Sequence, residues 1–326
     1  MNTPIANRYE FVYFFDITNG NPNGDPDAGN MPRIDPETGH GIVTDVCLKR
    51  KVRNYVGITK QYKPPYNIFV REGTFLNSEI ERAYEESEKV KDLFEKFLAH
   101  SKNKKGTPQP PQHYEDAARE WMCQTYYDVR TFGAVMTTKD ESKTSAEESD
   151  SGAETTTTRR KSSKLARTAG QVRGPVQIAF ARSIDPVAAL SASISRICAV
   201  SEDNPEQKGV IGRKNYIPYG LYRVHGFISP FFAKQTGFSE DDLELFWEAL
   251  NNMFEHDRSA ARMEMYKRRL IIFKHESELG NAHAHELFAR VTVCKKPGVA
   301  TPRAFSDYEI SVDTDNLPSG ISPLDK

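Results

Sequence analysis

Apolar and aromatic residues at every second position predict a β-strand near the start of the chain. Between residues 8 and 18 this alternation gives the strand two different faces. One face would carry Tyr9, Phe11, Tyr13, Phe15 and Ile17, and the other would carry Glu10, Val12, Phe14 and Asp16. Residues 19–41, which are rich in Asn, Gly, Pro and Asp, then predict a long loop.

Helical periodicity with clear start signals predicts two amphipathic helices. The first begins after Thr44, which would cap it, carries Asp45 in its first turn and ends near Gly57. The second begins at residues 239–242, whose sequence Ser-Glu-Asp-Asp forms a capping box. The core-facing residues would be Leu48, Val52, Tyr55 and Val56 in the first helix, and Leu243, Phe246, Trp247, Leu250, Met253 and Phe254 in the second.

The remaining patterns predict an α+β fold. Further helices are expected over residues 77–99 and 114–127, and further strands over 175–184, 190–200, 214–228, 269–274 and 287–293. A polar tip over residues 201–209 separates two of these strands, which predicts a projecting hairpin. The order strand, helix, strands, helix, strand is compatible with a modified RNA-recognition-motif (ferredoxin-like) core that carries large insertions. We therefore expect one elaborated domain over residues 1–326, with a helical insertion over 58–127.

Residues 139–168 form the least apolar stretch of the chain. They are rich in Ser, Thr and charged residues, so they bury too little apolar surface to offset the entropy of ordering the chain. Because strand-like sequence lies on both sides, we interpret the segment as a mobile loop within the fold and not as a domain boundary.

The composition is typical of a globular cytoplasmic protein. The chain has 326 residues, of which 38% are hydrophobic and 27% are charged. No apolar run approaches the roughly 18 residues of a membrane span, and residues 1–8 lack the apolar core of a signal peptide. Cys47, Cys123, Cys198 and Cys294 are isolated in the sequence, which fits a reduced compartment better than a zinc site or a disulfide framework.

Positive charge is concentrated in clusters, although the formal net charge is −1. A nucleic-acid-binding protein is usually basic overall, so such a role would here depend on local patches. Lys49, Arg50 and Arg53 share one face of the first predicted helix, and a second cluster over residues 159–173 includes Arg173. The alternative for any one cluster is a solvated surface.

The loop after the first strand is the most unusual feature of the sequence. Its alternating Asn and Asp residues resemble a calcium loop, but the sixth and twelfth positions counted from Asn21 are both Pro, where Gly and Glu are needed. The side chains of Asn19, Asn21 and Asn23 both donate and accept hydrogen bonds, and the glycines expose backbone N–H groups. Beside the basic helix, such a loop predicts a phosphate track. The alternative is a turn-rich connector.

Basic and aromatic residues alternate beside the predicted hairpin tip. Arg213 and Lys214 precede Tyr216, Tyr219 and Tyr222, an arrangement that suits single-stranded nucleic acid. The alternative, at least as strong for Tyr219 and Tyr222, is that the tyrosines pack the base of the hairpin.

Sequence signatures of catalysis are few. The chain has no Walker loop, no G-x-S-x-G and no G-x-G-x-x-G motif. His275, His283 and His285 have only glutamates and no Cys nearby, so ordinary turn and strand histidines are the better interpretation. We expect no catalytic residue, no metal and no cofactor.

Several multi-residue motifs occur in the same order as in a known family. They are Asp16 to Pro26 followed by Asn30, Pro32 and Arg33, then residues 128–135, 174–177, 180–186, 216–222 and 225–226. On these motifs the chain, from about Arg8 to Val293, resembles the Csd/Csh family of RAMP-like CRISPR-associated proteins. That family forms the backbone of the type I-C CRISPR Cascade complex.

The resemblance implies a non-catalytic subunit that binds guide RNA. In this family an RNA-recognition palm carries helical fingers, a web loop and a thumb hairpin, here residues 195–222, and copies stack head to tail along the crRNA so that it pairs with target DNA. Because each guide differs, the contacts must be to sugar and phosphate. The predicted RNA-binding residues are Asn19, Asn21, Asn23, Lys49, Arg50, Arg53, Arg130, Arg173, Arg213 and Lys214.

The family also implies other Cascade partners, namely the crRNA-processing subunit and the large PAM-reading subunit, and no membrane partner. The segment over residues 139–168 is longer and more polar than the family leads us to expect. An enzymatic alternative stays open. Related type III backbone subunits cut target RNA with an acidic residue in the loop after the first strand, where Asp25 and Asp27 lie in this chain.

Overall fold

The chain divides into two compact units. A computed structural model describes residues 3–102, 113–137, 167–195 and 211–326. The first unit comprises residues 1–63 and 174–326, and the second comprises residues 64–173. This division differs from the predicted single domain with an insertion over residues 58–127. The second unit is longer than that insertion because two strands beyond it pair with each other and close onto its core.

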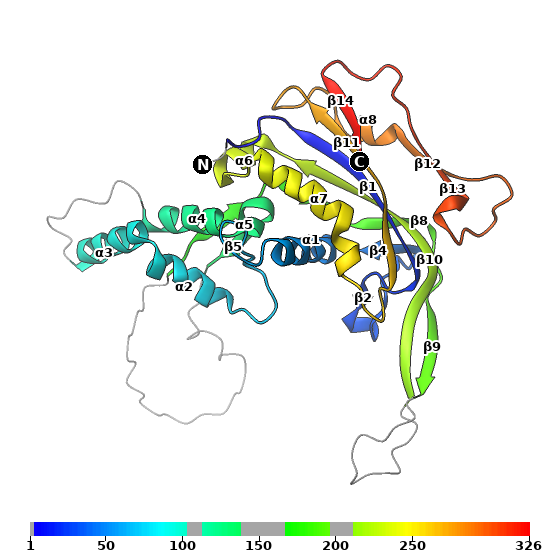
Figure 1. Cartoon of the computed structure of the whole chain (residues 1–326), viewed down its shortest axis with the longest axis horizontal. Coiled ribbons are helices and arrows are strands. Elements are labelled where there is room, and N and C mark those ends of the chain that lie inside the picture. The colour runs from blue at the N-terminus through cyan, green and yellow to red at the C-terminus, as the bar shows by residue number, and fades with distance from the viewer. Residues whose placement is uncertain (1–2, 103–112, 138–166, 196–210) are drawn as a thin grey trace, which may run out of the picture. The chain divides into compact units, whose positions relative to one another are not determined.

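A large antiparallel sheet forms the centre of the first unit, so the predicted α+β class is confirmed (Figure 1). Its strands lie in the order β14-β11-β1-β10-β8-β4, and β7 and β9 also pair with β10. Their bounds are β1 Tyr9–Gly20, β4 His40–Val43, β7 Val176–Ile178, β8 Ala181–Pro186, β9 Leu190–Ser195, β10 Ile211–Ile228, β11 Glu264–His275 and β14 Ile321–Asp325.

The central strand β1 is buried on both faces, with the alternation that the sequence predicts. The Phe11 ring packs edge-on against Trp247 of α7 (Glu240–His256), with ring centroids 5.3 Å apart. Val12 and Phe14 point the other way, into a second apolar cluster. Gly226 of β10 lies directly opposite Phe11, and a Cβ there would lie 2.0 Å from the Phe11 ring. Only glycine therefore fits at this position.

Two helices pack side by side on the Phe11 face of the sheet. The hydroxyl of Thr44 caps α1 (Asp45–Thr59), and Ser239 and Asp242 form the predicted capping box of α7. Tyr55 of α1 donates a hydrogen bond of 2.7 Å to Glu248 of α7. The predicted apolar stripes of both helices are buried. Helix α1 ends at Thr59, two residues beyond the predicted end near Gly57.

The opposite face of the sheet is covered by the C-terminal part of the chain. Its elements are α8 (Ala284–Ala289), β12 (Val291–Lys295), η3 (Phe305–Asp307) and β13 (Tyr308–Val312). The strand predicted over residues 287–293 therefore begins as a helix. Leu287 is fully buried there, and Phe288 stacks on His225 with ring centroids 4.2 Å apart. This packing onto the sheet outweighs the local strand pattern.

Helices make up most of the second unit. They are α2 (Leu76–Glu86), α3 (Glu88–Lys102), α4 (Tyr114–Thr125) and α5 (Tyr127–Phe132), followed by the paired strands β5 (Gly133–Met136) and β6 (Gly170–Arg173). The single helix predicted over residues 77–99 is two, because Ser87 is extended and its hydroxyl accepts the N–H of Val90 at 3.4 Å. Such a hydroxyl starts a new helix instead of continuing the old one.

Three predicted segments differ from the structure or fall outside it. The polar loop predicted over residues 139–168 lies outside the described residues except for 167 and 168, and so does the predicted tip over 201–209. The strand predicted over 175–184 is interrupted between β7 and β8, where Phe180 is 55% exposed. Within the described ranges, no helix has the length and apolar character of a membrane span.

The projecting hairpin begins at Leu190, as the strand predicted over residues 190–200 does, and not at residue 195, where the predicted thumb begins. Strands β9 and β10 pair from Leu190 with Tyr216 to Ser195 with Ile211. Residues 217–228 of β10 belong to the main sheet, where they pair with β1. We call residues 190–195 and 211–216 the β9–β10 ribbon, in place of the predicted span 195–222.

Candidate nucleic-acid interface

Three of the predicted RNA-binding residues lie on α1, on the side away from its buried stripe. At about 100° per residue, Lys49, Arg50 and Arg53 fall within one arc of the helix. Arg50 is exposed, and Lys49 and Arg53 are half-buried. The Lys49 ammonium group lies 2.9 Å from the carboxylate of Asp45, one turn earlier. The helix therefore presents a local basic face on a chain that is nearly neutral overall.

The fourth basic residue of α1 belongs to the core. Lys51 is 3% exposed and forms an ion pair with Asp257. The same carboxylate accepts a hydrogen bond of 3.0 Å from Arg262. Asp257 follows α7, so the pair ties α1 to the end of that helix. Helical periodicity already places Lys51 between the buried positions Leu48 and Tyr55, and this separates it from the other three basic residues.

The Asn-rich loop is fastened to the start of α1. Its elements are β2 (Gly24–Asp25), η1 (Pro26–Ala28) and β3 (Met31–Pro32). Asn23 accepts hydrogen bonds of 3.0 Å from both the backbone N–H and the hydroxyl of Thr44. Asn21 is 3% exposed and donates to the carbonyl oxygen of Asn30 at 2.8 Å. Asn19 is exposed at φ 49°, a left-handed conformation that Asn tolerates. Asn21 and Asn23 therefore shape the loop, and Asn19 presents its side chain to solvent.

The β9–β10 ribbon has two chemically different faces. Residues directly opposite each other in an antiparallel pair point to the same side. One face carries Leu190, Ala192, Ile194, Lys214 and Tyr216, and the other carries Ser191, Ser193, Ser195, Arg213 and Asn215. The register thus places the predicted contacts Arg213 and Lys214 on opposite faces. On the polar face, Asn215 donates a hydrogen bond of 3.0 Å to the carbonyl oxygen of Gly29 in the Asn-rich loop.

Two of the three tyrosines near the ribbon pack within the main sheet. Tyr219 is buried and donates a hydrogen bond of 3.0 Å to Asp16. Tyr222 is buried and stacks on Phe15 with ring centroids 5.3 Å apart. Burial raises the pKa of Asp16 against the opposing effect of the nearby Arg268 guanidinium. The packing alternative therefore holds for Tyr219 and Tyr222, whereas Tyr216 is half-buried at the base of the ribbon.

The second unit holds the other two predicted RNA-binding residues in different surroundings. Arg130 is 5% exposed, and its guanidinium donates to the carbonyl oxygen of Pro65 at 2.5 Å. It also lies 5.3 Å from the ring centroids of Tyr66 and Tyr127. Arg173 is exposed at the end of β6. These contacts give Arg130 a role inside the unit, and among these two only Arg173 is at the surface.

Most of the acidic and histidine residues considered for a nuclease or metal site form contacts within the protein. Asp25 accepts the N–H of Asp27 and lies 3.4 Å from Arg33, whereas Asp27 is exposed. His275 is fully buried against Glu10. Over the parts of the chain that the structure describes, no three His, Cys, Asp or Glu side chains are grouped so that they could hold a metal ion.

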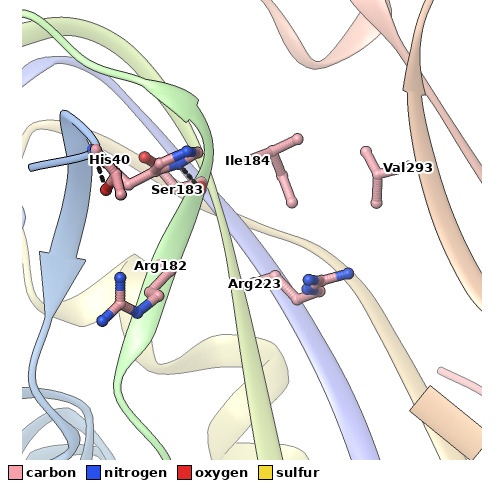
Figure 2. A pocket seen from close by; sticks show the side chains of 7 residues that line it. His40, Arg182, Ser183, Ile184, Arg223 and Val293 are labelled. Carbon is pink, nitrogen blue, oxygen red and sulfur yellow. Dashed lines mark hydrogen bonds between the residues drawn. The ribbon is translucent and has the colours of Figure 1, made fainter. Parts of the chain in front are cut away.

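A pocket that the sequence did not indicate lies on the main sheet (Figure 2). It has a volume of about 440 Å³ and is lined by Thr38, His40, Arg182, Ser183, Ile184, Arg223 and Val293. Arg182 of β8 and Arg223 of β10 lie directly opposite each other. Only the pairing register of two strands far apart in sequence brings these residues together, so no local pattern could have found the pocket.

These features define an α+β protein with one large antiparallel sheet, a basic helix beside a polar loop, and an appended helical unit. The family model of the CRISPR-associated protein Cas7 matches residues 7–313, and the chain belongs to this family. The predicted relation to CRISPR-associated proteins is thereby confirmed at the level of the family.

A curated relative and two solved structures are similar to the chain. The relative is a CRISPR-associated protein Cas7 of Haloferax volcanii, 27% identical over 287 residues, which cover 85% of this chain and 72% of the relative. A chain of a "CRISPR RNA-guided surveillance complex, pre-nicking" has a TM-score of 0.47 and 13% identity, with 82% of this chain and 78% of that chain covered. A chain of a "CRISPR RNA-guided surveillance complex" has a TM-score of 0.41 and 11% identity, with 82% and 68% covered. At such scores the structural likenesses carry no functional inference.

Proposed function

We propose that this protein is a guide-RNA-binding backbone subunit of a CRISPR surveillance complex of the type I-C kind. Membership of the Cas7 family supports this role. The observation that carries it is the Asn-rich loop, which is bonded to the basic helix α1 through Asn23 and Thr44 and to the β9–β10 ribbon through Gly29 and Asn215. One polar surface of the first unit therefore runs from a basic helix across a loop to a projecting ribbon.

The composition of this surface fits recognition of the RNA backbone. A guide-binding subunit must hold every guide sequence, so its contacts belong to sugars and phosphates. Lys49, Arg50, Arg53 and Arg213 supply cations for phosphates, and Asn19 supplies an exposed amide. Asn21 and Asn23 position the loop without contacting RNA in this proposal. Arg173 is a separate exposed cation on the second unit.

The main sheet fits a modified RNA-recognition-motif palm. The elements β1, α1, β8, β10, α7 and β11 follow one another in the strand-helix-strand-strand-helix-strand order of that motif. The four strands are neighbours in the order β11-β1-β10-β8, and α1 packs against α7. In this proposal the second unit corresponds to the fingers and the β9–β10 ribbon to the thumb.

The two faces of the ribbon fit an assembly of copies along one RNA. A two-stranded ribbon is marginally stable in water unless another surface covers it. Leu190 and Ile194 are 42% and 53% exposed on one face, which suits a neighbouring copy in a head-to-tail filament. The opposite face, with Arg213 and Asn215, suits the crRNA. Target DNA, the crRNA-processing subunit and the large PAM-reading subunit complete the proposed set of partners.

The proposed subunit binds RNA without cutting it. Asp25 is held by Arg33 and by the N–H of Asp27, so Asp27 is the acidic residue of this loop that a metal-dependent nuclease would use. Incubating the protein, loaded with guide RNA, with complementary RNA and Mg²⁺ tests this directly. We expect intact target. Cuts at regular intervals that an Asp27→Ala variant abolishes would establish the enzymatic alternative instead.

Substitution of the α1 cations tests the RNA-binding surface. The Lys49→Ala, Arg50→Ala, Arg53→Ala triple variant should weaken binding to single-stranded RNA and reduce the slope of log affinity against log salt by about 2, at roughly 0.7 per lost phosphate contact. Lys89→Ala, Lys91→Ala, Lys96→Ala is a matched control, because it removes the same charge from α3, where each lysine pairs with a carboxylate. Equal slopes for the two triple variants would refute the assignment.

A further inference from the structure

Two arginines lie directly opposite each other on neighbouring strands of the main sheet. Arg182 of β8 and Arg223 of β10 form one antiparallel pair. Like charges in such a position are destabilising, and their side chains extend in opposite directions across the pocket (Figure 2). Asp35 supplies a partner carboxylate for Arg182, so Arg223 is the member of this pair at which a bound anion would be expected.

The carboxylates near the pocket form ion pairs with cations other than Arg223. Asp35 lies 2.9 Å from Arg182, and Asp185 lies 2.9 Å from Lys295 and accepts a hydrogen bond of 2.7 Å from Tyr308. Arg223 is half-buried, and its guanidinium forms no hydrogen bond or ion pair with the described residues. Arg223 is thus the one pocket cation whose charge is not matched by a carboxylate within reach.

The remaining pocket residues are fixed in place and chemically mixed. The Nδ1 atom of His40 lies 2.8 Å from the carbonyl oxygen of Ser183, which orients the imidazole ring at the pocket wall. The hydroxyl of Thr38 lies 3.4 Å from the backbone nitrogen of His40. Ile184 and Val293 lie on the Arg223 side of the pocket (Figure 2). The pocket therefore combines a cation, hydroxyl groups and an apolar wall.

We propose that this pocket binds the phosphate of a nucleotide, with Arg223 as its principal ligand. A guanidinium binds phosphate through two parallel hydrogen bonds. The volume of about 440 Å³ is in the range of small-molecule sites, and the apolar wall of Ile184 and Val293 accommodates the ribose or base. Arg182 lies on the other side of the pocket, where Asp35 already matches its charge.

The effect of Arg223 on a neighbouring histidine is consistent with an unmatched charge. Burial, and then the positive charge of Arg223, lower the pKa of His225 to about 4. A phosphate on Arg223 would cancel the second of these effects.

The pocket is separate from the α1 surface. Arg223 pairs with Phe14 of β1 and therefore shares the face of Phe14, whereas α1 and α7 cover the face of Phe11. The inference therefore goes beyond the proposed function and does not depend on it. A chain that failed to bind guide RNA through α1 would still be expected to bind a nucleotide here.

Titration of the full chain with adenosine 5′-monophosphate and with adenosine tests the proposal by calorimetry. We expect the wild type to bind the monophosphate and to bind adenosine at least tenfold more weakly, since a charge-assisted contact contributes about that much. Arg223→Gln should weaken monophosphate binding by about tenfold or more, and Arg223→Lys should weaken it less. Arg119→Gln, which removes the same charge from the exposed side of α4, should have no effect.

Thermal unfolding keeps the test decisive if a variant folds poorly. The monophosphate should raise the unfolding temperature of the wild type and not that of Arg223→Gln. The Lys49, Arg50, Arg53 triple variant should retain monophosphate binding. Equal binding of nucleotide and nucleoside, or equal binding by Arg223→Gln and Arg119→Gln, would exclude a free nucleotide as the source of the phosphate.

A tetraadenylate distinguishes the two sources of such a phosphate. If the free nucleotide binds with the stated dependence on Arg223, the pocket is a nucleotide site. If only the tetraadenylate shows that dependence, the phosphate belongs to a nucleic-acid strand. If neither ligand depends on Arg223, the proposal is wrong.

Discussion

Asn23 joins the loop to the basic helix, and its truncation tests how strongly the candidate surface is preorganised. In Asn23→Ala, the backbone N–H and the hydroxyl of Thr44 lose the acceptor that lies 3.0 Å from each of them. The hydroxyl of Thr44 still caps α1 by accepting the N–H of Cys47. The helix should therefore persist while the loop loses its attachment.

The size of the effect follows from these two hydrogen bonds. Each contributes about 0.5–1.5 kcal/mol net, and Thr44 is half-buried, so water can replace part of what is lost. We expect the unfolding free energy of the first unit to fall by about 1–2 kcal/mol. RNA affinity should also fall, but the slope of log affinity against log salt should not change, because no charge is removed.

The two tryptophans allow each unit to be followed alone. Trp247 lies in α7 of the first unit and Trp121 in α4 of the second. In a Trp121→Phe background, urea unfolding monitored by Trp247 fluorescence reports the first unit and avoids treating two units as one transition. Asn252→Ala is a matched control, because that exposed amide donates a hydrogen bond of 2.9 Å to the carbonyl oxygen of Glu248 within α7 and also interacts with the hydroxyl of Tyr55. As a surface substitution it should change stability by about 0.5 kcal/mol or less.

The reasoning fails if Asn23→Ala is as stable as Asn252→Ala, since the loop would then be held by other contacts. It also fails if the salt slope falls together with the affinity. That result would mean that the loop change displaces the phosphate-binding cations themselves.

Three further predictions concern other parts of the first unit. Ile194→Asp should stop several copies from assembling on one RNA while a single copy still binds. Ser193→Asp, on the polar face, should instead weaken the binding of every copy. Identical sedimentation of the two variants with RNA would contradict different roles for the two faces of the ribbon. Asp257→Asn should destabilise the first unit by about 3 kcal/mol or more, because Lys51 would remain buried without its carboxylate, and a loss below 1 kcal/mol in urea unfolding would contradict this. The pKa of His225 is lowered to about 4 from its usual value near 6.5, so its contribution to stability is present above pH 6.5 and is lost as the pH falls toward 4. In His225→Phe the unfolding free energy should therefore change less with pH between 6.5 and 4 than it does in the wild type. The same pH dependence in both proteins would refute this prediction.

The fold could be predicted where local pattern and burial agree. The alternation of β1, the cap of α1 and the capping box of α7 are local signals, and each appears in the structure as expected. The errors occur where distant contacts decide. Residues 287–293 read as one strand, yet packing of Leu287 and Phe288 onto the sheet makes the first part a helix. On β10 the ribbon stops at Tyr216, before the predicted end at residue 222, because β1 and not β9 pairs with residues 217–228.

The candidate site could be predicted in its residue types but not in its geometry. The sequence placed a basic face on α1 and a polar loop beside it. It could not show that Asn23 bonds to Thr44, or that Arg213 and Lys214 face opposite sides, since both depend on tertiary contacts and register. Arg130 was predicted to bind RNA because it lies in the family motif over residues 128–135, and the structure places it in the interior with carbonyl and aromatic partners. Arg182 and Arg223 are 41 positions apart in sequence and became neighbours only through strand pairing.

Sedimentation velocity with single-stranded RNA of guide length tests the central claim most directly. The proposal predicts that several copies bind one RNA in steps until it is full, and that two RNAs of unrelated sequence give the same affinity and the same number of copies. Binding that follows one sequence only, or that stops at one copy on RNA long enough for several, would contradict a backbone subunit that holds its guide through sugars and phosphates.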